Sequence, residues 1–239
     1  MGIHIITFAT HSSGKFEKLK DDLKKNNIEL NVIGWGTKWE CYLKKLENTI
    51  ENINNYNDDD ILVVIDGFDT EVSGNFCITE LEKIYKTNFN DNIVVSLDPY
   101  TSPLPKILHN YLHNRIFGGP ANAGMYMGTK KHLMPFLKDV MKDTTSKRCK
   151  NDDQCGINLT LNKYNNVTID YDKLIFNNID KTKNDKNKGM FYGYPLSFTY
   201  DRILRIPKDY SKFLITEILF LVLLIIMFFT YKVTYPLGQ

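Results

Sequence analysis

Cysteine is scarce in the 239-residue sequence, and charge of one sign is not in excess. The four cysteines, Cys41, Cys77, Cys149 and Cys155, include no Cys-x-x-Cys pair, so no zinc site is indicated. Cys149 and Cys155 are near enough in sequence for a local disulfide in an oxidising compartment, but we expect free thiols. Lys and Arg total 30 against 28 for Asp and Glu, which argues against nucleic acid or a strongly basic protein as a partner.

The N-terminal stretch MGIHIITFAT lacks the basic start and the small-residue cleavage site of a secretory signal peptide, and we expect it to form the first β-strand. Near the other end, FLITEILFLVLLIIMFFTYKV contains twelve uninterrupted apolar residues from Ile218 to Phe229. This run predicts a transmembrane helix at about 213–231, with a buried core helix as the alternative. More Lys and Arg residues precede the run than follow it, which favours a cytosolic side for the preceding domain.

Before this run, apolar stretches alternate with stretches of helical periodicity. We predict strands at Ile3–Ala9, Ile28–Ile33, Ile61–Ile65, Ile93–Leu97, Ala123–Gly128, Val167–Ile169 and Leu174–Phe176. We predict helices at Lys15–Asn26, Trp39–Ile53, Phe76–Tyr85, Lys130–Met141 and Asp153–Lys163. This order predicts an α/β domain over residues 1–207, with a mostly parallel, Rossmann-like sheet and helices on both faces. Residues 208–239 would form a C-terminal membrane anchor.

Two stretches interrupt the alternation. The segment from Pro99 to Pro120 is rich in proline, and we expect a partly ordered loop near the site. The stretch NNIDKTKNDKNKG is rich in Asn and Lys, and we expect a surface loop.

The stretch DDDILVVIDGFDTEVSG, residues 58–74, places two acids where a buried strand ends. Asp66 follows the apolar run Ile61–Ile65, and Asp69 comes three positions later. Two carboxylates this close repel each other. A divalent cation with a bound diphosphate would relieve the repulsion and give Lewis-acid help to a leaving group. Alternatively, one acid is solvated in the turn and the other caps the Phe76 region or a neighbouring loop.

Other candidate binding residues also fall near strand or helix ends, where ligands of parallel sheets bind. In FGGPANAGMYMG, glycines permit close backbone approach to a ligand, and Asn122 can donate a hydrogen bond to a sugar hydroxyl or a phosphate. The alternative is a loop followed by a bulged strand. In CKNDDQCG, Asp152 and Asp153 either cap the next helix or bind sugar hydroxyls or act as a base. Asp98 follows a predicted strand directly.

Six motifs occur in the order ITFAT, VVIDGFDTEV, VVSLDPY, NAGMYMG, DDQCGINLTL and TIDYDKLIFNNI. In order and rough spacing, from residue 3 to about 180, they resemble the glycosyltransferase domain of procollagen lysyl hydroxylases and the related collagen-type glycosyltransferases. The resemblance implies a GT-A fold that transfers a sugar from a UDP-sugar, with manganese as the usual metal.

The resemblance also implies roles for individual residues. Asp66 and Asp69 would ligate the metal. Four residues would bind the nucleotide, with the ring of the last stacked on uracil: Thr7, Thr10, Tyr42 and Phe68. Four residues would surround the donor sugar and the acceptor: Asp98, Asn122, Asp152 and Asp153.

One departure from the family concerns a late histidine of its metal site. The corresponding stretch here is FYGYPLSF, with Tyr192 or its neighbour where the histidine would stand. A tyrosine hydroxyl, with a pKa of ~10, is a poor manganese ligand at neutral pH.

Two functions follow from these observations. The first is a metal-dependent transferase that moves a hexose from a UDP-sugar to hydroxylysine or another hydroxyl of a protein or glycan. The alternative is a catalytically degenerate, membrane-anchored module that binds a nucleotide-sugar. The compartment is open as well, because flanking charge favours the cytosol and the resemblance favours the secretory lumen.

Overall fold

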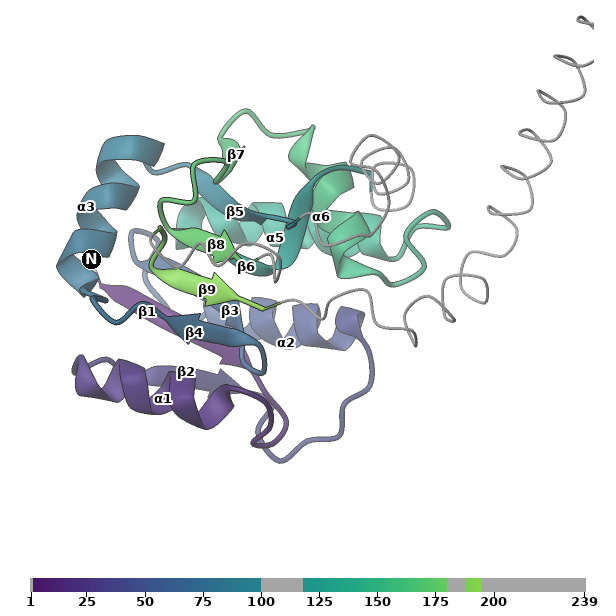
Figure 1. The fold of residues 1–239 in the computed structure, drawn as a ribbon. Coiled ribbons are helices and arrows are strands. Elements are labelled where there is room, and N and C mark those ends of the chain that lie inside the picture. The colour runs from purple at the N-terminus through teal and green to yellow at the C-terminus, as the bar shows by residue number, and fades with distance from the viewer. Residues whose placement is uncertain (1, 100–117, 180–187, 195–239) are drawn as a thin grey trace, which may run out of the picture. The chain divides into compact units, whose positions relative to one another are not determined.

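The computed structural model describes residues 2–99, 118–179 and 188–194 (Figure 1). The predicted transmembrane helix at about 213–231 lies outside these ranges, as do most of the Pro99–Pro120 segment and residues 180–187. Within the described ranges, no helix has the length and apolar character needed to cross a bilayer.

A six-stranded sheet forms the centre of the described part, in the order β2-β1-β3-β6-β5-β7. Its strands are β1 (Ile3–Phe8), β2 (Leu30–Ile33), β3 (Ile61–Asp66), β5 (Ile93–Leu97), β6 (Ala121–Thr129) and β7 (Val167–Ile169). β1 pairs in parallel with β2 and β3, and β5 pairs in parallel with β7, whereas β6 runs antiparallel to β3 and β5. The sheet is therefore mostly parallel, as predicted, with β6 as its reversed strand.

Helices cover both faces of this sheet (Figure 1). α1 (Phe16–Lys25) and α3 (Ile78–Phe89) pack on one face, whereas α2 (Tyr42–Ile53), α5 (Lys130–Thr144) and α6 (Asp153–Leu161) pack on the other. The central strand β3 contributes to both cores, because side chains alternate along a strand: Val63 and Ile65 belong to the core on the α1 and α3 face, and Leu62 and Val64 to the core on the opposite face. A strand buried on both faces has an unbroken apolar sequence, which is the pattern of residues 61–65.

A second sheet of three short strands has the order β4-β9-β8. β4 (Thr70–Val72) pairs antiparallel with β9 (Phe191–Gly193), which pairs in parallel with β8 (Phe176–Asn178). Asn178 Nδ2 donates a hydrogen bond of 2.8 Å to the carbonyl of Leu97. This contact ties the second sheet to the end of β5.

Asp170, which is buried, shapes the connection between β7 and β8. Its carboxylate accepts hydrogen bonds from the backbone N–H groups of Leu174, Ile175 and Phe176, at 2.9, 2.8 and 2.8 Å. An ionised carboxylate only accepts hydrogen bonds, so it can satisfy several N–H groups of one turn. β8 therefore begins at Phe176, and not at Leu174 as the apolar pattern predicted.

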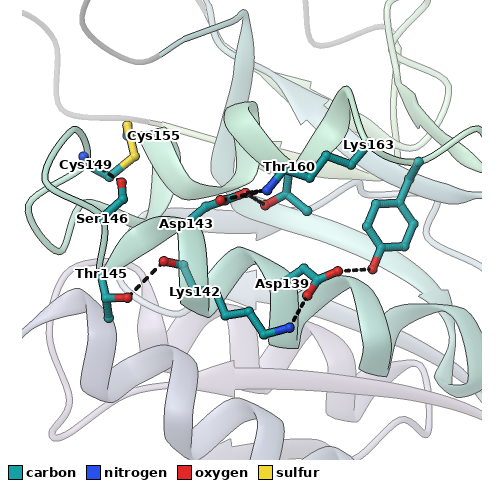
Figure 2. A network of polar contacts seen from close by, with 10 residues as sticks. Asp139, Lys142, Asp143, Thr145, Ser146, Cys149, Cys155, Thr160 and Lys163 are labelled. Atoms are coloured by element: carbon teal, nitrogen blue, oxygen red, sulfur yellow. Dashed lines mark hydrogen bonds and ion pairs between the residues drawn. A yellow bond between two sulfur atoms is a disulfide. The ribbon is translucent and has the colours of Figure 1, made fainter.

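Polar contacts join α5 to α6, and a disulfide joins the connection between the two helices to the first turn of α6 (Figure 2). On the α5 side, Asp143 accepts a hydrogen bond of 2.6 Å from Thr160 Oγ1, and Asp139 accepts one of 2.8 Å from the Tyr164 hydroxyl. The carboxylates of α5 thus contact α6 and Tyr164, which follows the end of α6.

Cys149 and Cys155 form a disulfide, with sulfur atoms 2.03 Å apart and Cα atoms 5.3 Å apart. The expectation of free thiols is therefore wrong for this pair. The reason lies in the intervening loop, where Lys150 and Asn151 have φ of 50° and 69°. Two successive left-handed residues fold the chain back, so that the two cysteines meet across the start of α6.

Candidate active site

The carboxyl ends of β1, β3 and β5 meet the start of the reversed strand β6 at one edge of the large sheet. Asp66 is the last residue of β3 and lies opposite the last residue of β1 in the register. Leu97 of β5 pairs with Ala121 of β6, so Asp98 and Asn122 come to the same edge. Ligands of such sheets bind at this edge, which makes it the candidate site.

Lys45 of α2 links two of the predicted site acids. Its Nζ lies 2.5 Å from Asp66 Oδ1 and 3.7 Å from Asp153 Oδ2, and its side chain is 12% exposed. Burial works against the ammonium charge, but the carboxylates of Asp66 and Asp153 outweigh it and raise the pKa of Lys45. We call these three residues the acid–lysine cluster; they join α2, β3 and α6.

Gly124 of β6 makes room for the Asp66 carboxylate. A Cβ atom at position 124 would lie 2.9 Å from Asp66 Oδ2 and 2.8 Å from Asn122 Oδ1. The N–H of Gly124 also donates a 2.8 Å hydrogen bond to Asn122 Oδ1. The sequence predicts that the glycines of this stretch allow a ligand to approach the backbone closely. In the structure, it is the Asp66 carboxylate that approaches the backbone at Gly124.

Asp69 lies in the turn between β3 and β4. Burial is the larger cause that raises the pKa of its carboxyl to about 7, and the charge of Asp66 adds to it. Lys45 and Lys15 act in the opposite direction. Ionisation of the partly buried Asp69 carboxyl beside the Asp66 carboxylate costs free energy, and a bound cation would offset this cost.

Asp152 and Asp153 have different surroundings. Asp152 is the N-cap of α6, and its side chain accepts a 2.8 Å hydrogen bond from the Cys155 N–H. Asp153 is the first residue of the helix, and its side chain is 15% exposed. Burial chiefly raises the pKa of Asp153 to about 6, with Lys45 opposing the shift and Asp66 adding to it. One acid therefore fixes the helix start, and the other belongs to the acid–lysine cluster.

An amide network holds Asp98 beside this cluster. Asn122 Nδ2 donates to Asp98 Oδ1 at 3.1 Å, and Gln154 Nε2 lies 3.5 Å from Asp98 Oδ2. Ser96 Oγ donates to the Asn122 carbonyl at 3.2 Å. The network connects the ends of β5 and β6 to the first turn of α6.

The two threonines predicted to line the nucleotide pocket are both buried. Thr7 has no exposed surface, and its hydroxyl donates a 2.8 Å hydrogen bond to the Ile65 carbonyl, which joins β1 to β3. Thr10 Oγ1 lies 2.9 Å from His11 Nδ1. Thr7 therefore lies beneath the edge of the sheet, and Thr10 lies in the loop that follows β1.

The two predicted aromatic residues lie in different elements, Phe68 in the turn between β3 and β4 and Tyr42 at the start of α2. The Phe68 ring packs against His11, with centroids 5.3 Å apart, and Tyr42 packs edge-on against Trp39, with centroids 5.4 Å apart. Tyr42 is 51% exposed as a residue, yet burial of its hydroxyl and the charge of Asp153 raise its pKa. The Tyr42 hydroxyl thus feels the charges of the acid–lysine cluster, while its ring reaches solvent.

Strand β9 contains Tyr192, and this residue or its neighbour stands where the family has its late histidine. Tyr192 is the register partner of Glu71, and the Tyr194 N–H donates a 2.8 Å hydrogen bond to the Asp69 carbonyl. The Tyr194 hydroxyl donates to Glu71 Oε2 at 2.8 Å, and Lys15 Nζ lies 2.7 Å from Glu71 Oε1. The stretch therefore lies beside Asp69, and the hydroxyl of Tyr194 points toward Glu71.

No three His, Cys, Asp or Glu side chains are grouped to hold a metal ion within the residues that the structure describes. Asp66 and Asp69 nevertheless offer carboxylate oxygens, which Mg²⁺ and Mn²⁺ prefer, and the charge of one raises the pKa of the other. One or two carboxylates, completed by substrate phosphates and water, are a usual donor set for such ions. The residues present therefore fit a divalent cation that binds together with a diphosphate.

Sequence reasoning did not find Lys45, Gln154 or Lys15. Only a weak signal in the sequence indicates that Lys45 points inward. It directly precedes Leu46 and lies one helical turn before Thr49, and Leu46 and Thr49 are both buried. Position 45 thus lies at the margin of the apolar face, where a lysine can extend along the helix to a neighbouring acid. Gln154 and Lys15 had no comparable signal, since helix starts are commonly polar.

A mixed, mostly parallel sheet with flanking helices and carboxylates at its strand ends fits the GT-A class of glycosyltransferase folds. A solved structure, described as a glycosyltransferase involved in the glycosylation of the major capsid of PBCV-1, is similar to this chain, with a TM-score of 0.56. The likeness covers 82% of this chain and 93% of that one at 11% identity, and it concerns the fold alone. No curated protein matches the sequence.

The chain belongs to the PLOD GT domain family, whose model matches residues 1–191. This match confirms the resemblance drawn from the six motifs. The described part of the chain is therefore a glycosyltransferase domain of that family.

Proposed function

We propose that the chain is a metal-dependent glycosyltransferase that moves a hexose from a UDP-sugar to a hydroxyl group, that of hydroxylysine or of another protein or glycan acceptor. The observation that carries the proposal is the convergence of Asp66, Asp69 and Asp153 at one edge of the sheet in a member of the PLOD GT domain family. Members of the GT-A class often use a divalent cation and a nucleotide-sugar.

In this proposal Asp66 and Asp69 hold the cation, with Mn²⁺ as the expected ion. When bound, it supplies Lewis-acid stabilisation of the departing diphosphate. Phe68 stacks on the uracil base and Tyr42 borders it, since Phe68 follows the end of β3 by two residues and Tyr42 begins α2, the helix that carries Lys45. Thr10 borders the nucleotide from the loop after β1, and Thr7 supports that loop from below.

The residues on the α6 side orient the sugar and the acceptor. Asp98 and Asn122 present a carboxylate and an amide at the same edge, held by their mutual 3.1 Å hydrogen bond. Asp152 fixes the first turn of α6, which sets the position of Asp153. Asp153 accepts the proton of the acceptor hydroxyl, a role suited to a carboxyl whose pKa is raised to about 6.

A second candidate function is a module that binds a nucleotide-sugar without turnover. Two observations favour it: FYGY, residues 191–194, has no histidine beside Asp69, and Lys45 already pairs with Asp66 at 2.5 Å. A site with fewer protein ligands and a fixed ammonium nearby holds a metal less firmly, which weakens catalysis more than nucleotide binding.

Thermal unfolding with UDP and Mn²⁺, followed by an assay for UDP release from UDP-sugars, separates these functions. A shift of the unfolding temperature with UDP release supports the transferase, and a shift without release supports the binding module. The double variant Asp66→Ala, Asp69→Ala should lose the Mn²⁺-dependent part of the shift. If that variant still responds to Mn²⁺ as the wild type does, the metal assignment is wrong.

We also propose that residues 208–239 anchor the domain to a membrane and that the domain faces an oxidising lumen. The disulfide between Cys149 and Cys155 supports the lumenal side, because structural disulfides persist in oxidising compartments. The excess of Lys and Arg before the apolar run supports the cytosolic side instead. Protease protection in sealed microsomes decides between them, and full digestion without detergent would contradict the lumenal proposal.

A further inference from the structure

The contact between Lys45 and Asp66 has no role in the sugar transfer proposed above, although it involves a proposed metal ligand. Lys45 Nζ is 2.5 Å from Asp66 Oδ1, and the lysine side chain is 12% exposed, while that of Asp66 is 37% exposed. The lysine thus occupies the inner oxygen of an acid whose outer part reaches solvent. Its neighbour Lys44 points outward and pairs with Glu47 at 3.2 Å.

The two oxygens of Asp66 have different surroundings. Oδ1 accepts a hydrogen bond from the ammonium of Lys45, whereas Oδ2 lies beside Gly124, whose lack of a Cβ atom leaves room there. A divalent cation at Asp66 would therefore share the carboxylate with a positive charge. Lys45 Nζ also lies 3.7 Å from Asp153 Oδ2, and the lysine lines a small cavity together with Tyr126 and Thr49.

We infer that Lys45 is a resident cation that lowers the affinity of the Asp66–Asp69 site for a divalent metal ion in the absence of nucleotide. The inference rests on the proposed metal site. The physical reason is twofold: the ammonium takes up a ligand oxygen, and its charge repels the incoming ion at short range in a partly buried site. Lys45 thereby acts on the affinity of the metal site without being one of its ligands.

The inference is tested by titration of the purified protein with Mn²⁺ alone at pH 8, with free Mn²⁺ measured by electron paramagnetic resonance. The variant Lys45→Met removes the charge and keeps an unbranched side chain that is one atom shorter. We expect it to bind Mn²⁺ at least tenfold more tightly than the wild type. Lys45→Arg keeps the charge and should stay close to the wild type, as should the matched control Lys44→Met.

Removal of one partner from a buried ion pair can destabilise a fold, so circular dichroism and thermal unfolding accompany each variant. Lys45→Gln retains a hydrogen-bond donor toward Asp66 and is the second neutral variant, with the same expectation. Equal or weaker Mn²⁺ binding by the neutral variants would overturn the inference, because a merely structural lysine could only lower the affinity when removed.

A further variant separates this inference from the proposed function. Adding Asp66→Asn to Lys45→Met should abolish the gain in Mn²⁺ affinity; a gain that persists would mean that the ion binds elsewhere and would overturn the inference. UDP release is measured separately on the wild-type protein. Absence of UDP release would remove the transferase proposal and leave the Mn²⁺ comparison intact.

Discussion

Replacement of Asp170 by alanine should lower the free energy of unfolding by about 4 kcal/mol. Asp170 is 1% exposed, and its carboxylate accepts three backbone hydrogen bonds in the connection between β7 and β8. A hydrogen bond to a charged group contributes about 1.5–3 kcal/mol. Since the emptied turn can partly rehydrate, we expect a total slightly below about 4.5 kcal/mol, the lower end of the sum of three such bonds.

Urea unfolding followed by circular dichroism measures this loss. The matched control is Asp172→Ala, two positions along the same connection, where the side chain is exposed and the expected change is within about 0.5 kcal/mol. Asp170→Asn keeps one acceptor oxygen and should fall between the two. A loss of less than about 1 kcal/mol for Asp170→Ala would refute the argument that this carboxylate holds the connection in place.

Three further predictions concern stability. Reduction of the disulfide between Cys149 and Cys155, which closes a loop of sequence separation 6, should lower the free energy of unfolding by about 2 kcal/mol. Urea titrations with and without dithiothreitol measure this loss, and an unchanged midpoint would contradict the prediction. Gly124→Ala should destabilise the fold by about 1–3 kcal/mol, because its Cβ atom would crowd two oxygens at 2.8 and 2.9 Å. Gly74→Ala, whose Cβ atom would meet nothing within 4 Å, is the control, and equal effects of the two would refute the crowding argument. Asp60 accepts a hydrogen bond from the Gly2 N–H, and this bond is the largest cause that lowers the pKa of the Asp60 carboxyl. The ionised Asp60 therefore stabilises the fold fully above pH ~4, and this stabilisation is lost as the pH falls through the lowered pKa. Asp60→Asn should therefore flatten the acid side of the stability profile, and an unchanged acid slope would show that other carboxylates dominate.

The fold could be predicted from the sequence where elements are long or buried on both faces. β5 and β7 have the predicted bounds, and α2 begins at Tyr42, a few residues after the predicted start at Trp39. β4 and β9 were not predicted, because three-residue strands are too short for a periodic pattern. The reversed direction of β6 was not predicted either, since alternation of side chains is the same for both strand directions.

The candidate site divides in a similar way. Acids such as Asp66 and Asp98 could be found because they end or follow apolar runs, and such ends converge on one edge of the sheet. The resemblance of the motifs to a known family pointed to Asp69 and Asp153 as well. Lys45 could not be found by these means, because Lys44 and Lys45 are identical in type and adjacent, and only the rotation of α2 against the sheet decides which one points inward.

The hydrogen bond between the Tyr194 N–H and the Asp69 carbonyl, 2.8 Å long, joins the last described residue to the turn that carries a proposed metal ligand. Strand β9 pairs with β4 directly after that turn, so the backbone of Asp69 is bordered by the strand before it and by the stretch 191–194 beside it. A substitution in that late stretch can therefore displace the Asp69 carboxylate through the backbone alone.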